Sequence, residues 1–160
     1  MADLDRSGAL SLNLPFMDRA RDDFIVLLAR VDEADDARLP AAWSDLVECA
    51  ARNFAQEDAW MRSTGHASRK DHAIQHRVVL EVMREGALQS GEGRLLQVRE
   101  MARQLRGWYE KHVQTMDAAL ALHLRSARFE PAHAHVPAKP SLTVWSALRE
   151  AVEHTASQRA

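Results

Sequence analysis

Four stretches of the chain repeat apolar side chains at intervals of three and four residues, which is the spacing of one helical face. This spacing predicts helices over residues 15–36, 40–64, 68–85 and 94–125. Pro, Gly and polar residues separate these stretches, so we expect short connections. Four amphipathic helices joined in this way predict an all-α protein, an up-down-up-down antiparallel four-helix bundle.

The two ends of the chain carry weaker patterns. Residues 1–14 are expected to form an irregular N-terminal arm. Residues 126–160 begin with a Pro/His-containing linker and end in a short fifth C-terminal helix, expected over 141–156. We therefore divide the chain into a bundle, 1–125, and this C-terminal segment. The apolar face of the last helix either packs back on the bundle or docks on a second chain, which leaves a homodimer open.

Composition narrows the class of protein. The chain has 160 residues, of which 46% are apolar and 28% charged, which is typical of an ordinary globular domain. A net charge of −2 does not indicate a nucleic-acid surface. The single Cys49 excludes an internal disulfide and favours a reducing compartment. With no apolar run of membrane-spanning length and no leader-like pattern in residues 1–14, we expect a cytoplasmic protein with neither a nucleic-acid nor a membrane partner.

Three of the expected helices carry ionisable side chains at positions where a bundle core usually places leucine. Glu57 lies on the apolar face of the second helix, and His72 and His76 lie one turn apart on the third. His112 lies on the fourth, and Asp117 follows it by five residues, about 140° away around an α-helix. A buried carboxylate needs a cationic partner or a metal. We expect these five side chains to meet at one level of the core.

Three imidazoles and two carboxylates form a mixed nitrogen and oxygen ligand set. Such a set favours Fe, Mn, Ni or Zn over Ca or Mg, which prefer oxygen ligands alone. One alternative remains at this stage: a bundle whose polar core is paired internally and binds no metal.

The motifs that carry these residues resemble those of the hemerythrin-like family of HHE cation-binding domains, over roughly residues 13–124. That family carries Asp-x-x-His on its first helix and His-Phe-x-x-Glu-Glu-x-x-Met on its second. Its third and fourth helices carry His-x-x-x-His and His-x-x-x-x-Asp. The corresponding segments here read DRAR from Asp18, NFAQEDAWM from Asn53, HAIQH from His72 and HVQTMD from His112. Trp108, four residues before His112, matches a tryptophan usual in the family.

Two departures from the family pattern stand out, because Arg21 and Asn53 occupy positions where the family has histidine. Those two histidines serve one iron of the family's di-iron centre, and a guanidinium cannot replace them as a metal ligand. The resemblance therefore implies one non-haem Fe, with Zn open and a second ion less expected. The implied ligands are His72, His76, His112, Glu57 and Asp117. We expect Arg21 to fill the vacated position by bonding both carboxylates, and Asn53 to hydrogen-bond Glu57.

The function implied by the resemblance is metal binding in a degenerate site. Oxygen carriage in the family uses two irons, so a single metal favours sensing or sequestering of metal, O2, NO or peroxide, without catalysis. Two alternatives stay open, a metal-free interaction scaffold and an iron-dependent enzyme that handles peroxide or NO. We assign no catalytic residue, because the single phenol, Tyr109, is expected to face away from the site. His66 is expected at the surface, and Cys49 as a small packed residue.

Overall fold

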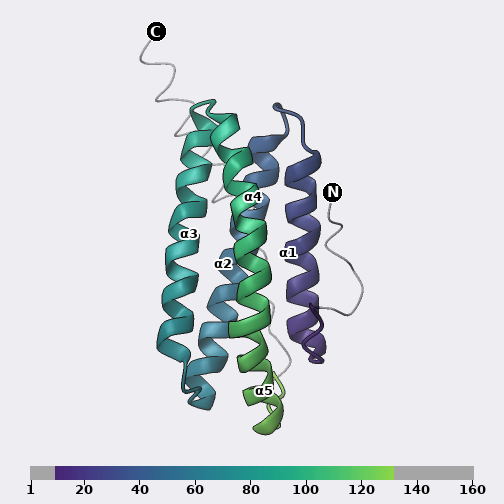
Figure 1. Cartoon of the computed structure of the whole chain (residues 1–160), viewed down its shortest axis with the longest axis vertical. Coiled ribbons are helices and arrows are strands. Elements are labelled where there is room, and N and C mark those ends of the chain that lie inside the picture. The colour runs from purple at the N-terminus through teal and green to yellow at the C-terminus, as the bar shows by residue number, and fades with distance from the viewer. Residues whose placement is uncertain (1–9, 132–160) are drawn as a thin grey trace, which may run out of the picture. The chain divides into compact units, whose positions relative to one another are not determined.

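The computed structural model describes residues 10–131, and these form four helical rods that lie side by side (Figure 1). Three rods are single helices, and the fourth is continuous but changes its winding. The elements are α1 (Pro15–Glu33), α2 (Leu39–Thr64), α3 (Arg69–Gly91), α4 (Leu95–His112), the π-helical turn η2 (Val113–Asp117) and α5 (Ala118–Ser126). Helix α2 packs against α1 and α3, and α4 packs against α3 and α1. The predicted all-α bundle is confirmed, whereas the helix expected over 141–156 lies outside the described residues.

The helix ends follow local chemistry where a proline or glycine acts directly. Pro15 occupies the first turn of α1, where its missing N–H costs nothing. Helix α2 ends where Gly65 turns into the left-handed region with a φ of 68°, and the N–H of His66 then bonds the carbonyl of Met61. Both ends were predicted to within one residue. Helix α1, however, ends at Glu33, three residues earlier than expected.

Helix α3 is longer than the sequence predicts, because Gly86 lies inside it and does not end it. A Cβ atom at Gly86 would come within 2.8 Å of the Trp43 ring and 2.9 Å of the Met101 sulfur. The Trp43 indole N–H also donates to the carbonyl of Met83 at 2.8 Å, which holds the ring against α3. Gly86 therefore allows close packing of helices. The connection to the next helix is correspondingly shorter than the sequence predicts, and α3 runs to Gly91.

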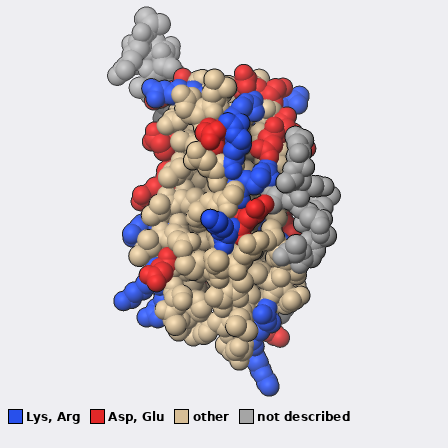
Figure 2. Space-filling model, viewed as in Figure 1, with Lys and Arg blue, Asp and Glu red and all other residues tan. Residues whose placement is uncertain are grey.

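One continuous apolar core runs between the rods, and a layer of buried polar side chains interrupts it. On the outer face shown in Figure 2, basic and acidic side chains are interspersed rather than gathered by sign. Within residues 10–131, no helix combines the length and the apolar character needed to cross a membrane.

Candidate metal centre

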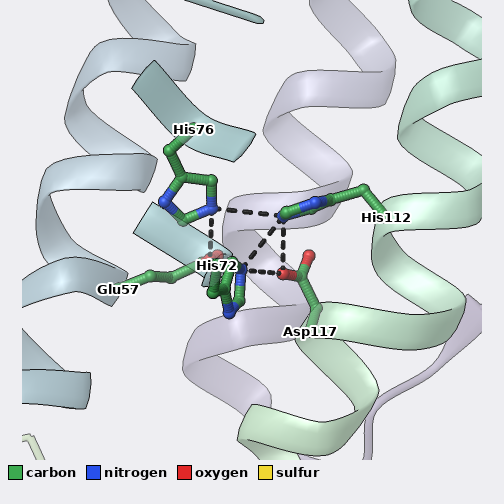
Figure 3. Close-up of side chains that lie close together, drawn as sticks. All are labelled: Glu57, His72, His76, His112 and Asp117. Atoms are coloured by element: carbon green, nitrogen blue, oxygen red, sulfur yellow. Dashed lines mark hydrogen bonds and ion pairs between the residues drawn. The ribbon is translucent and has the colours of Figure 1, made fainter. Parts of the chain in front are cut away.

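The buried polar layer is a cluster of five side chains contributed by α2, α3, α4 and η2 (Figure 3). Each side chain offers one nitrogen or oxygen atom toward a common point, and these five atoms lie within 4.8 Å of one another. All five residues are buried, with His72 fully inaccessible to solvent. The members are Glu57, His72, His76, His112 and Asp117, so the structure brings together every residue expected to bind the metal.

The distances inside the cluster are short. The Nε2 atom of His112 lies 3.1 Å from the Nε2 atoms of both His72 and His76. Asp117 Oδ1 lies 3.1 Å from the Nε2 atoms of His72 and His112. Glu57 Oε2 lies 3.3 Å from His76 Nε2 and 3.5 Å from His72 Nε2. A shared cation at the centre, or protons on the imidazoles, must hold so many lone pairs together.

Two residues outside the cluster orient its imidazole rings. His76 Nδ1 lies 2.9 Å from Asp58 Oδ1, and His112 Nδ1 lies 3.0 Å from Gln75 Oε1. Because both partners offer acceptor oxygens, each ring carries its proton on Nδ1 and keeps the Nε2 lone pair for the cluster. Sequence reasoning assigned no role to Asp58 or Gln75. The family motif could have indicated a role for Asp58, because Asp58 occupies its second acidic position. Nothing in the sequence indicated a role for Gln75.

Aromatic rings fix the same two imidazoles from the side. Phe54 stacks on His76 with ring centroids 4.2 Å apart and planes 7° apart. Trp108 stacks on His112 at 4.5 Å and 22°. Stacking and outer hydrogen bonds together leave little rotational freedom to these rings, so the cluster is preorganised.

The five ligand atoms outline a square pyramid with His72 at its apex. Two nitrogen–oxygen pairs are longer than the rest, His76 with Asp117 and His112 with Glu57: each exceeds 4.0 Å and lies within 4.8 Å. These pairs are the diagonals of the base. Half of a diagonal is about 2.0–2.4 Å, which is the range of bonds from a transition metal to imidazole nitrogen and carboxylate oxygen. The residues present would therefore fit one metal ion held by all five side chains.

The π-helical turn explains how Asp117 joins His112 on one face. In an α-helix, a spacing of five residues would turn Asp117 about 140° away. Residues 113–117 adopt i→i+5 winding, which sets residues five apart nearly one above the other. The sequence showed the spacing, but it did not reveal this local change of winding.

The electrostatics of the metal-free cluster favour protonated imidazole beside ionised carboxylate. Burial alone lowers the pKa of His72, but hydrogen bonds and charges from Asp117 and Glu57 outweigh burial and raise this pKa to about 9. Burial also raises the pKa of Asp117, but hydrogen bonds and charges from His112 and His72 hold it well below its usual range. Protons therefore compete with a metal for this site.

Arg21 does not make the expected hydrogen bonds to Glu57 and Asp117. Its guanidinium bonds Asp18 Oδ1 at 3.2 Å and Asp22 Oδ1 at 2.7 Å, both on its own helix. Asp18 and Asp22 lie three residues and one residue from Arg21 along the chain, so α1 itself supplies the partners of the guanidinium. Glu57 Oε2 and Asp117 Oδ1 are consequently buried with the cluster imidazoles, rather than Arg21, beside them.

Asn53 likewise bonds in a direction different from that expected. Its side-chain amide donates to the backbone carbonyl of Ala20 at 3.0 Å and contacts Cys49 Sγ at 3.6 Å, so it ties α2 to α1 rather than to Glu57. The Cys49 thiol is buried, as expected, and burial raises its pKa.

A small cavity occupies the space between the cluster and α1. It offers about 10 Å³ to the centre of a water-sized sphere, which is roughly the room of one water molecule. Its polar lining consists of Arg21, Asn53, Glu57, Tyr109 and Asp117. Tyr109 is buried and stacks on Phe24 with centroids 3.9 Å apart, so the expectation that it faces away was wrong. Its position in the sequence predicted the wrong side of α4, because the apolar face of this helix is wider than the sequence indicated.

A second pair of histidines lies apart from the cluster. His66, expected at the surface, is buried, and its ring centroid lies 4.8 Å from that of His123. His123 Nε2 contacts the hydroxyl and the carbonyl of Thr64 at 3.0 and 3.2 Å. This pair joins the C-terminal end of α2 to α5 and contributes no atom to the metal cluster.

Comparison with known proteins adds one relative. The chain is 28% identical over 118 residues to the bacteriohemerythrin of Ralstonia nicotianae, and the aligned region covers 74% of this chain and 86% of the relative. No family model matches the sequence. No solved structure matches it either. The bundle, the five converging ligand atoms and this relative together support a hemerythrin-like family for the chain.

Proposed function

We propose that this protein binds a single non-haem iron ion through Glu57, His72, His76, His112 and Asp117, and that it senses or sequesters a small molecule at the remaining position. The observation that carries the proposal is the square pyramid of five buried ligand atoms around one point. Its interior spacing corresponds to metal–ligand bonds, and its one open side leaves room for one exogenous ligand.

Iron accounts for the site better than zinc does. Structural zinc is usually four-coordinate and tetrahedral, whereas five protein ligands at roughly right angles favour an ion with octahedral preference. The relative is named a bacteriohemerythrin, which agrees with iron. Two carboxylates also balance the charge of a divalent ion, so that the buried site is neutral when the imidazoles are neutral.

A single bound ion agrees with the residues on the α1 side, where Arg21 and Asn53 replace the two histidines of the family pattern. Arg21 is engaged by two aspartates, and Asn53 by a backbone carbonyl, so neither offers a ligand for a second metal. One iron cannot supply the electrons that reversible oxygen carriage draws from two. Sensing or sequestering of NO, O2, peroxide or the metal itself is therefore favoured over carriage.

An enzyme that handles peroxide or NO is the second candidate. Tyr109 favours it, because a phenol now lines the cavity beside the cluster. A metal-free scaffold is less favoured, because without a cation the buried Glu57 and Asp117 carboxylates depend on protons held by the imidazoles.

Metal analysis of the anaerobically purified protein tests the proposal. Mass spectrometry of the intact complex, together with elemental analysis, should give one iron per chain. Adding NO to the ferrous protein should produce a new electron-spin signal. Two irons per chain would refute the single-ion site, zinc alone would refute iron, and no metal after reconstitution would favour the scaffold.

A further inference from the structure

We propose that the Tyr109 hydroxyl donates a hydrogen bond to the outer atom of a neutral diatomic ligand held between the metal and the cavity. This inference rests on the proposed function, since it needs the iron site, and it adds the binding position, the donor and the class of ligand. The positions of the ligand atoms, the lining of the cavity and the environment of the phenol support it in turn.

The open side of the square pyramid faces the cavity. The pyramid has His72 at its apex, so the free position lies beyond the base formed by the other four residues. The cavity borders both carboxylates of that base, Glu57 and Asp117, but none of the three imidazoles. A ligand at the sixth position therefore projects toward α1 and the vacated histidine positions.

Tyr109 is suited to donate a hydrogen bond into this space. Its ring is buried and is held by the stack on Phe24, and the residue forms part of the cavity wall. Tyr109 lines the cavity together with Glu57 and Asp117. Burial, and then the charges of Asp117 and Glu57, raise the pKa of the phenol well above its usual value, so the hydroxyl keeps its proton.

The charges around the cavity select a neutral ligand. A divalent ion and two carboxylates sum to zero, so an anionic ligand would bring an uncompensated charge into a buried site. The nearest cation, Arg21, is already paired with two aspartates. The cavity also has room for about one small atom beyond the metal position. A diatomic whose outer oxygen accepts a hydrogen bond, such as NO or O2, meets these conditions.

Nitric oxide bound to the ferrous full-length protein is the probe, and Tyr109→Phe is the variant. The variant keeps the ring and its stack and removes only the donor. A hydrogen bond to the outer oxygen lowers the N–O stretching frequency, so this frequency should rise in the variant. NO should also dissociate about three- to tenfold faster, which corresponds to the loss of one hydrogen bond. Thr115→Val, which removes an exposed hydroxyl from η2, should change neither value.

The outcomes separate the inference from the function beneath it. A normal NO complex with the same stretch and release rate in Tyr109→Phe would overturn the inference and leave the iron site standing. Failure of iron-loaded wild-type protein to bind NO would overturn both. Azide tests the class of ligand: tight binding to the ferrous protein that weakens in Tyr109→Phe would show that the pocket selects anions. If the variant does not fold, electron–nuclear double resonance of the wild-type NO complex must still show one exchangeable proton near the ligand.

Discussion

The two sides of the buried site differ in how they hold charge. On the imidazole side, three histidines and two carboxylates converge, and Asp58 and Gln75 outside them fix two of the rings. On the α1 side, the family's two remaining histidine positions hold Arg21 and Asn53, whose bonds lead away from the centre. Both sides lie in the same bundle, and they share the two carboxylates.

This difference shows that the interior packs on the α1 side without histidine at residues 21 and 53. That side holds a salt bridge within α1, a hydrogen bond from the Asn53 side-chain amide to α1 and a stacked pair of aromatic rings. None of these contacts reaches the two carboxylates, and a small cavity remains beside them. The lone pairs on the imidazole side need a cation or protons between them, whereas the α1 side keeps the cavity.

Replacing one side chain with leucine on each side should change metal affinity by very different amounts. His112→Leu removes a ligand and should lower metal affinity by more than about 100-fold, because the ring lies at the centre of the cluster. Asn53→Leu should change affinity by less than about threefold. Competition with a calibrated chelator measures both. Equal losses in the two variants would show that the sides are not functionally distinct.

Side chains that hydrogen-bond the site from outside should affect metal affinity on the imidazole side only. Asp58→Asn should lower metal affinity by about 10- to 100-fold, because the partner that orients His76 loses its charge. Asp22→Asn, which weakens the salt bridge to Arg21, is the matched change on the α1 side and should leave affinity unaltered. Unchanged affinity in Asp58→Asn would mean that Phe54 alone positions the ring.

The metal-free protein should lose stability at alkaline pH. The folded pKa of His72 is raised to about 9, against an ordinary value of about 6.5. A raised pKa contributes stability that is complete below about pH 6.5 and is lost as the pH rises through about 9. The expected loss is about 3 kcal/mol in the free energy of unfolding, measured by urea titration. The metal-loaded protein should not show it, and a pH-independent metal-free protein would contradict the proton competition.

Restoring histidine on the α1 side should restore the second ion. Arg21→His combined with Asn53→His supplies the two ligands that the family pattern places there, beside carboxylates that already face the cavity. Metal content should rise from one ion to two per chain. If it stays at one, Tyr109 and Phe24 have narrowed the cavity beyond what a second ion needs.

Particular residues show where sequence reasoning succeeded and where it failed. Four cluster residues were found because each is an ionisable group on an otherwise apolar stripe, whereas Asp117 was found through its spacing from His112 in the family motif. Gly86 was mistaken for a helix end, because sequence does not distinguish a glycine that ends a helix from one that admits a neighbouring ring. The bonding of Arg21 was misjudged, since several carboxylates lay within its reach and only the packed backbone selects among them.

The sequence by itself determined the helices, their order and the residues that occupy the buried polar layer, because helical periodicity assigns each residue to a face. Tertiary structure alone decided the winding of η2, the direction of Arg21 and the place of Tyr109 in the cavity wall. The physical reason is the distance along the chain between the interacting residues. Periodicity depends on neighbours within one helix. The direction of a long side chain and a local change of helical winding depend on atoms that only tertiary packing brings close.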